Sequence, residues 1–197
     1  MTSPHVLAVS RDTTHRFSKV PEPSIHLIAG IGVLGDAHAG TLVQHRYAAR
    51  KDPNQPNLRQ VHLIGAELFD EARERGFEVG PGDLGENVTT AGIDLISLPT
   101  GTLLDLGGPV VRLTGLRNPC VLINRFSPGL LKVVLARADG TPLGRAVPDE
   151  PRDDRPAPQV IRKAGVMSVV ERGGEVVPGA AITVTLPDGP HVAMEPV

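Results

Sequence analysis

Residues 107–120 of the chain read Gly-Gly-Pro-Val-Val-Arg-Leu-Thr-Gly-Leu-Arg-Asn-Pro-Cys. The Gly-Gly-Pro at the start is a turn signal. The run Val110–Leu116 that follows is rich in β-branched residues, which favour extended backbone. Pro119 then fixes its own backbone and restricts the residue before it. The stretch therefore predicts a strand that begins after a turn and ends just before Cys120.

Short apolar runs of the same kind recur along the chain. The 22 glycines and 19 prolines are scattered between these runs, a pattern typical of a β-dominated domain. Aromatic residues make up only 3% of the chain, so the core must depend on Val, Leu and Ile. We expect strands at Val6–Ser10, Ser24–Ala29, Val61–Ile64, Leu103–Leu106, Val110–Leu116, Gly165–Val170 and Ala181–Leu186.

Two segments predict helices. Gly65–Arg75 carries apolar residues on one face and ends at Gly76, a residue type common after helices. Within it, Glu71 and Arg75 have the i,i+4 spacing of a helical ion pair. The second segment, Gly129–Ala136, follows a Ser-Pro pair and has an apolar stripe. The sequence thus predicts a mainly β fold with a few peripheral α-helices.

Two polar stretches predict loops. Ala48–Arg59 and the longer Arg137–Gln159 contain little that could pack into a core. A chain of 197 residues suits one domain. We therefore expect a single domain over residues 1–197, with a long loop or insertion around 137–159.

Composition and charge argue against several classes of protein. The net charge is −2 and no basic tract stands out, so nucleic acid is not an expected partner. No apolar stretch has the length of a membrane span, and the first ten residues do not resemble a signal peptide. A single cysteine cannot form an internal disulfide. We expect a cytoplasmic, reducing setting and no membrane partner.

Cys120 is the first candidate for chemistry. It follows Pro119 at the end of the predicted strand, where a side chain can enter a pocket. Arg117 is close in sequence, and a nearby cation favours the thiolate form of a cysteine. A thiolate can bind a soft metal, attack a sulfur donor or hold a persulfide. The alternative is that Cys120 is a small buried hydrophobic residue, as lone cysteines often are.

A second candidate site is the glycine-flanked segment Gly35–Gly40. Asp36 and His38 are two residues apart, so an extended backbone would point both to one side. With His45 and His62 they could hold zinc or iron, because imidazole and carboxylate suit these metals. The alternative is a turn whose polar side chains are satisfied locally.

The third candidate is the loop Gly80–Thr90, which has three glycines and a proline. It would display Asp83, Glu86 and Asn87 just before a β-prone run. Such a loop could line a pocket. The alternative is a hairpin whose Asp and Asn side chains cap their own backbone.

The motifs taken together resemble a known family, the MOSC (molybdenum cofactor sulfurase C-terminal) proteins of the stand-alone type. The resemblance covers nearly the whole chain and ends in a cysteine at the family's cysteine position. In the family's order, the motifs are Lys19-Val20-Pro21, Gly35-Asp36-Ala37-His38-Ala39-Gly40, Val61-His62-Leu63-Ile64, Pro81-Gly82-Asp83-Leu84-Gly85-Glu86-Asn87, Leu98-Pro99-Thr100-Gly101-Thr102, Arg117-Asn118-Pro119-Cys120 and Gly165-Val166-Met167.

This resemblance implies a β-barrel-like core and a link to the molybdenum cofactor. In amidoxime-reducing members the corresponding cysteine is a molybdenum ligand, so that role falls on Cys120. Arg117 and Glu86 join it as expected catalytic residues. The residues expected to bind the pterin cofactor or line its pocket are Lys19, Gly35, Asp36, His38, Arg46, His62, Gly85, Asn87 and Asn118. The chain is too short for the desulfurase domain of the sulfurase, so no pyridoxal phosphate is expected. It also lacks the N-terminal barrel of the amidoxime reductases.

Four functions remain open at this point. The first is a molybdenum-cofactor oxidoreductase that reduces N-hydroxylated compounds, supplied by an electron-transfer protein. The second is a persulfide carrier or sulfurtransferase that uses Cys120 and receives sulfur from a cysteine desulfurase. The third is a metal-dependent hydrolase or lyase built on the His and Asp cluster, with Glu86 as base. The fourth is a binding module for a small anionic ligand. A homodimer is an expected state, because edge-rich β folds often dimerise.

Overall fold

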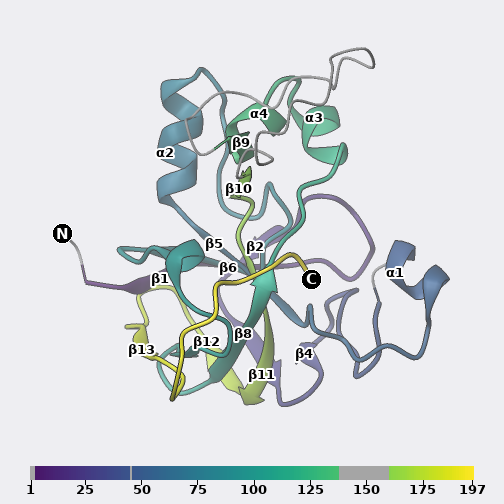
Figure 1. Ribbon diagram of the computed structural model, residues 1–197, viewed down its shortest axis with the longest axis vertical. Coiled ribbons are helices and arrows are strands. Elements are labelled where there is room, and N and C mark those ends of the chain that lie inside the picture. The colour runs from purple at the N-terminus through teal and green to yellow at the C-terminus, as the bar shows by residue number, and fades with distance from the viewer. Residues whose placement is uncertain (1–2, 45, 138–159) are drawn as a thin grey trace.

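The computed structural model describes residues 3–44, 46–137 and 160–197 (Figure 1). Its strands are β1 (His5–Arg11), β2 (Val20–Glu22), β3 (Ile25–Ile28), β4 (Gly32–Val33), β5 (Val61–Gly65), β6 (Val88–Ala91), β7 (Leu103–Asp105), β8 (Val110–Leu116), β9 (Leu135–Arg137), β10 (Val160–Arg162), β11 (Val166–Arg172), β12 (Gly174–Val176) and β13 (Thr183–Thr185). The helices are α1 (Arg46–Lys51), α2 (Glu67–Glu74), α3 (Leu122–Phe126) and α4 (Leu131–Val134), with a 3-10 turn, η1, at Leu95–Ser97. None of the described helices has the length and hydrophobicity to span a membrane.

One mixed sheet dominates the fold. Its eight strands run in the order β13-β7-β8-β11-β5-β6-β1-β2. All neighbouring pairs are antiparallel except β5 and β6, which α2 connects as a parallel pair. Strand β8 lies between β7 and β11, and its alternate residues Val111, Leu113 and Gly115 form a buried face. The sheet therefore holds the segment after β8, which leads to Cys120.

The two ends of the sheet curl toward each other. An antiparallel bridge joins His5 of β1 to Ala181, just before β13. Val6 and Ala180 extend this contact, since the Val6 N–H donates to the Ala180 carbonyl at 2.8 Å. The strands described here do not form a closed barrel by continuous pairing. The predicted β-dominated fold is confirmed. Among the described strands, the contacts that His5 and Val6 make with Ala181 and Ala180 give the fold its barrel-like feature.

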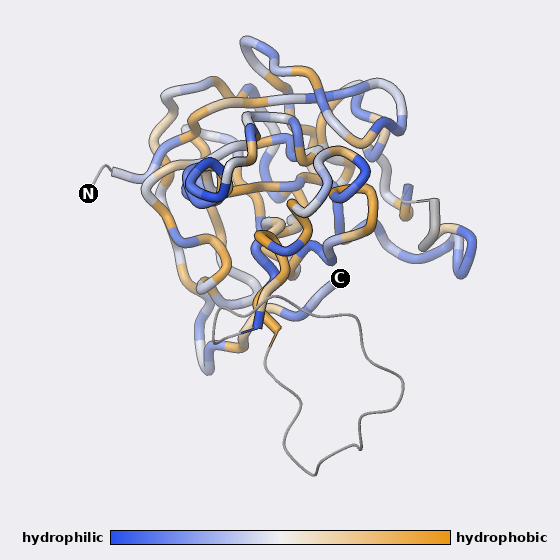
Figure 2. Tube along the Cα trace, turned by 90° about the horizontal axis from the view of Figure 1, so that it is seen from above, coloured by the Kyte–Doolittle hydropathy of each residue, from blue (hydrophilic) through white to orange (hydrophobic). Residues whose placement is uncertain are grey.

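Two hydrophobic cores lie on either side of the cysteine segment. The first is the sheet interior, centred on buried side chains such as Leu63, Leu104 and Leu113. The second core joins α2, α3 and α4 through the buried side chains of Leu68, Ile123 and Val133. Figure 1 shows these three helices together at one end of the molecule, with α1 apart from them. Figure 2 shows that the peripheral segment carrying α1 is largely hydrophilic.

The predicted elements are mostly present. All seven predicted strands occur, and Val110–Leu116 has the expected bounds. The helix predicted at Gly65–Arg75 is α2, and Arg75 donates to Glu71 at 2.8 Å as expected. The helix predicted at Gly129–Ala136 is too long. The observed helix, α4, begins at Leu131 and stops at Val134, because Leu135 takes an extended backbone and starts β9, which pairs with β10.

Several elements were not predicted. The short strands β2, β4, β6, β9, β10 and β12, and the helices α1 and α3, have too few residues to produce a clear periodicity. Helix α1 begins just before the stretch Ala48–Arg59 that was expected to be a loop. The expected insertion Arg137–Gln159 lies, apart from Arg137 itself, outside the described residues.

Candidate functional site

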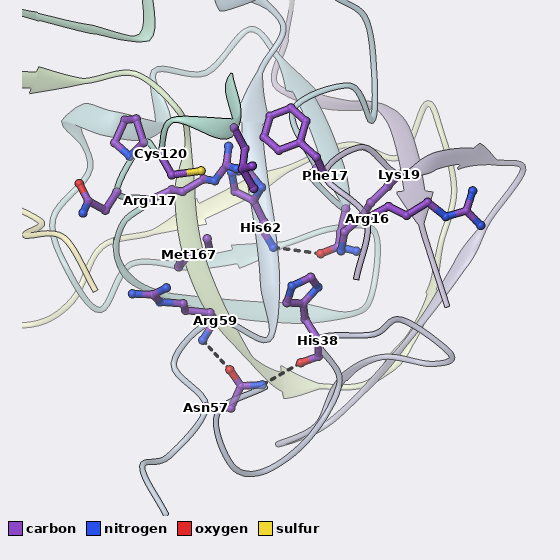
Figure 3. A pocket seen from close by; sticks show the side chains of 15 residues that line it. Arg16, Phe17, Lys19, His38, Asn57, Arg59, His62, Arg117, Cys120 and Met167 are labelled. Carbon is purple, nitrogen blue, oxygen red and sulfur yellow. Dashed lines mark hydrogen bonds between the residues drawn. The ribbon is translucent and has the colours of Figure 1, made fainter. Parts of the chain in front are cut away.

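A cavity of about 430 Å³ opens where the chain leaves β8, and we name it the Cys120 cavity (Figure 3). Its walls come from the loop before β2, the segments around β5 and β6, the segment after β8 and one residue of β11. The lining residues are Arg16, Phe17, Lys19, His38, Asn57, Arg59, His62, Gly85, Asn87, Arg117, Asn118, Pro119, Cys120, Leu122 and Met167. Its volume is in the range of small-molecule sites.

The thiol of Cys120 is free and exposed within this cavity. The backbone on either side is fixed: the Arg117 N–H donates to the Gly165 carbonyl, and the Ile123 N–H donates to the Cys120 carbonyl. Figure 3 shows the sulfur turned toward the Arg117 side chain. The alternative that Cys120 is a buried hydrophobic residue is therefore wrong.

The guanidinium group of Arg117 has a donor nitrogen without an acceptor among the described residues. Its Nη1 is buried and has no hydrogen-bond partner among the residues that the structure describes. Its Cζ lies 5.9 Å from the centre of the Phe17 ring. Burial lowers the pKa of Arg117, although the neighbouring Cys120 and Glu86 oppose this shift. A buried unpaired donor costs free energy, so this nitrogen indicates a site for an acceptor or anion.

Lys19, in the cavity wall, and Asp36, behind it, form a buried ion pair. Lys19 Nζ lies 2.6 Å from Asp36 Oδ2, and Asn87 Nδ2 donates to the same oxygen at 3.0 Å. The His38 N–H donates to the other oxygen, Oδ1, at 2.9 Å. Burial alone would raise the pKa of Asp36, but the His38 hydrogen bonds and the Lys19 charge outweigh it and hold the pKa well below its usual range. Asp36 thus fixes the side chains that face the cavity.

His62 lies at the base of the cavity and is almost fully buried. Its Nε2 donates to the Ala164 carbonyl at 2.8 Å. Burial, and then the positive charge of Arg117, hold the pKa of His62 well below its ordinary value. The ring is therefore neutral at pH 7 with its proton on Nε2.

Glu86 is fully buried and does not line the cavity. Its Oε1 accepts hydrogen bonds from the Gly82 N–H at 2.5 Å and the Thr89 hydroxyl at 3.2 Å. Its Oε2 has no partner among the described residues. Burial raises the pKa of Glu86 despite these hydrogen bonds and the charge of Arg117. Glu86 thus fixes the backbone of the loop at Gly82, and its side chain is not in contact with the cavity.

The structure brings most of the sequence candidates together. The residues expected at the site that line the cavity are Lys19, His38, His62, Gly85, Asn87, Arg117, Asn118 and Cys120. Gly35, Asp36 and Glu86 lie behind the wall. The Arg46 side chain and His45 lie outside the part of the chain that the structure describes.

Sequence reasoning missed several lining residues. Arg16 and Phe17 directly precede the Lys19 motif, so proximity to that motif was the available signal. Asn57 and Arg59 lie in a polar stretch expected to be a loop, but Asn57 donates to the His38 and Gly40 carbonyls. This places Arg59 at the cavity, where it also donates to the Val197 carbonyl. No local pattern could have identified it.

The proposed metal cluster of His and Asp side chains finds no support. In residues 3–44, 46–137 and 160–197, no group of three or more His, Cys, Asp and Glu could hold a metal ion. Asp36 is already paired with Lys19, and the His62 Nε2 is occupied by a backbone carbonyl. The described residues therefore do not favour the hydrolase or lyase alternative.

Comparison with known proteins identifies the fold and the family. The structure of YuaD from Bacillus subtilis is similar, with a TM-score of 0.66 and 22% identity over 93% of this chain and 96% of that chain. YiiM from Geobacillus stearothermophilus has a TM-score of 0.59 and 15% identity, covering 96% of this chain and 79% of that chain. YiiM from Escherichia coli has a TM-score of 0.56 and 16% identity over 98% of this chain and 74% of that chain.

The sequence itself gives the more specific result. No curated protein matches the chain. The family model of the MOSC domain matches residues 50–183, which is more than half of the chain and includes β5, β8 and Cys120. The chain belongs to the MOSC domain family.

Proposed function

We propose that the Cys120 cavity binds a molybdenum–pterin cofactor and that the protein reduces N-hydroxylated compounds. The observation that carries this proposal is the pairing of an exposed thiol with a buried, unpartnered arginine nitrogen in one cavity. A soft metal prefers thiolate, and an anionic group prefers arginine. Cys120 thus offers a thiolate ligand for the metal, and Arg117 offers a donor to an anionic group of the cofactor.

The remaining walls suit an anionic, partly apolar ligand. Arg59 adds positive charge to that of Arg117, whereas the charge of Lys19 is neutralised by Asp36. Phe17, Leu122 and Met167 provide apolar surface that would exclude water from the bound group. Asn87 is held by Asp36, so its backbone and side chain form a fixed part of the wall.

The chemistry divides between the bound group and the protein. The cofactor, when bound, supplies the two-electron redox chemistry. The protein would bind the metal through Cys120 and the anionic groups through Arg117 and Arg59. Reduction of an N-hydroxyl group breaks the N–O bond, consumes two electrons and two protons, and releases water. We propose that a separate electron-transfer protein supplies these electrons.

Persulfide transfer is the second candidate function. The thiol is exposed, and the chain has no second cysteine that could divert a bound sulfur into an internal disulfide. In this case a cysteine desulfurase would donate a sulfur atom to the Cys120 thiolate, and the cavity would pass it to an acceptor. The exposed thiol favours this function as much as the first, but it leaves the unpartnered Arg117 nitrogen unexplained.

The test is the metal and pterin content of purified protein from a host that makes the cofactor. We expect close to one molybdenum and one pterin per wild-type chain, and loss of both in Cys120→Ser. The matched control is the double variant Cys120→Ser with Ser97→Cys, which keeps one thiol but moves it to an exposed turn. Metal in that double variant at the wild-type level would overturn the proposal.

A second measurement separates the two functions. The wild-type protein is incubated with a cysteine desulfurase and cysteine, and its intact mass is recorded. One added sulfur atom on metal-free protein, absent in Cys120→Ser, would favour the carrier function. An unchanged mass, with molybdenum bound, would favour the oxidoreductase.

A further inference from the structure

A second hollow lies beside the Cys120 cavity, and we name it the Phe126 groove. It has a volume of about 440 Å³ and is more open to solvent than the cavity. The groove shares four lining residues with the cavity, Arg16, Phe17, Lys19 and Leu122. Its other lining residues are Asp12, Ser18, Val20, Arg125 and Phe126. The two hollows are therefore adjacent, with Phe17 and Leu122 lining both.

One wall of the groove exposes large apolar side chains. Phe126 is 37% exposed, Leu122 39% and Val20 57%. The Phe17 and Phe126 rings lie at 5.8 Å between centroids with an interplanar angle of 41°, so they form one tilted aromatic surface. Exposed apolar groups gathered in a hollow next to a reactive group indicate a ligand with an apolar body.

The rim of the same groove carries unbalanced positive charge. Arg125 is exposed, and its guanidinium has no hydrogen bond or ion pair in the part of the chain that the structure describes. Arg16 uses its Nε for Asp12 and Thr14, and 70% of its side chain is exposed. In Figure 3 its guanidinium points away from Cys120.

The negative charge in the groove is already engaged. One oxygen of Asp12 accepts hydrogen bonds from the Thr14 backbone and hydroxyl, and the other lies 3.1 Å from Arg16 Nε. Lys19 is neutralised by Asp36. One carboxylate therefore faces two arginines, and the groove has room for one more negative charge.

We infer that the Phe126 groove binds an amphipathic carboxylate, with its ring or chain on Phe126 and Leu122 and its carboxylate on Arg125. If the proposed function holds, this ligand is the substrate, and its reactive end extends past Phe17 toward Cys120. Binding in the groove itself uses neither Cys120 nor a cofactor. The inference can therefore be tested separately from the proposed function.

Three probes test the chemistry on the full chain: 3-phenylpropionate, 3-phenylpropan-1-ol and acetate. Binding is followed through the methyl NMR signals of Leu122 and Val20. We expect saturable shifts with 3-phenylpropionate, at least about fivefold weaker binding of the alcohol, and no saturation with acetate. Equal binding of the acid and the alcohol would show that Arg125 does not bind the carboxylate. Absence of saturable binding by the acid would overturn the inference.

Variants then locate the site. Arg125→Gln and Phe126→Ala should each weaken binding of 3-phenylpropionate by at least about fivefold. Arg73→Gln, which changes an exposed arginine on α2, is the matched control and should bind as the wild type does. Cys120→Ser should also bind the probe normally, whatever its metal content. Weakening by Arg73→Gln equal to that by Arg125→Gln would contradict a defined site.

Discussion

The ammonium group of Lys19 lies 2.6 Å from the carboxylate of Asp36, and only 4% and 1% of the two side chains are exposed. Two charges this deeply buried are stable only because each neutralises the other. Asn87 and His38 complete the shell of Asp36. The loop before β2, the turn after β4 and the start of β6 are therefore joined beneath the cavity.

Removing one member of this pair should destabilise the protein strongly. Lys19→Met leaves Asp36 as an uncompensated buried charge, and we expect a loss of about 3–5 kcal/mol in the free energy of unfolding. Urea denaturation of the wild type and of Lys19→Met at pH 7 measures this difference in the free energy of unfolding. The double variant Lys19→Met with Asp36→Asn should be more stable than Lys19→Met alone by at least about 1 kcal/mol. Additive losses in the double variant would show that the pair is not coupled.

The buried Glu86 predicts a stability that depends on pH. Its pKa is raised in the folded state, so the folded protein keeps a proton that the unfolded chain loses above about pH 4.3. This contribution to stability is fully present below that pH and is lost as the pH rises toward the folded-state pKa. Glu86→Gln removes the titration but keeps an oxygen for the Gly82 N–H. The stability of the variant relative to wild type should increase with pH between 4 and 7.

Urea midpoints for wild type and Glu86→Gln at several pH values give this comparison. Asp83→Asn is a suitable control, since Asp83 lies in the same loop and its Oδ2 accepts a hydrogen bond from the Gly80 N–H at 2.9 Å. A difference between Glu86→Gln and wild type that stays constant with pH would contradict the burial argument.

Arg117 predicts stabilisation by simple anions. Inorganic phosphate that pairs with the unpartnered Nη1 should raise the free energy of unfolding by about 1.4 kcal/mol at roughly ten times its Kd. Arg117→Gln should remove this phosphate dependence, because a neutral amide cannot replace the guanidinium charge. Thermal unfolding with and without phosphate measures the effect. Arg112→Gln, which changes an exposed arginine paired with Glu171, should respond to phosphate as the wild type does.

The backbone around Gly165, beneath the cavity, leaves no space for a side chain at this position. Its φ is +92°, and a Cβ there would collide with the Leu63 carbonyl and lie 2.9 Å from the His62 Nε2. Gly165→Ala should therefore cost at least about 3 kcal/mol of stability. Gly76→Ala is the matched control, because Gly76 has a φ of +82° but open space around it. That variant should lose only about 1–2 kcal/mol from backbone strain. Equal losses, measured by urea denaturation, would rule out the steric cause.

The sequence predicted the sheet well because burial and alternation are local properties. The run from Val110 to Leu116 predicts its strand from local features alone, because it contains β-branched residues and follows a turn signal. The parallel pairing of β5 with β6 and the bridge from His5 to Ala181 depend on how distant segments meet. No local pattern contains that information. Strands of two or three residues, such as β4, escape prediction for the same reason.

The site was predicted in part, again for physical reasons. The position of Cys120 followed from Pro119 and the end of the strand. Arg59 enters the cavity only because Asn57 anchors its loop to the His38 and Gly40 carbonyls, a contact over many residues. Glu86 lies in the glycine-rich loop Gly80–Thr90, yet its buried side chain contacts the loop backbone instead of the cavity.

Cys120 occupies the short connection between the core inside the sheet and the core among the helices. Ile123, three residues later, is fully buried in the helical core, and its N–H donates to the Cys120 carbonyl. A change of volume at Ile123 is therefore transmitted to the sulfur through one hydrogen bond and one turn of chain. Substitution at Ile123 should therefore shift this thiol while every residue that lines the cavity stays the same.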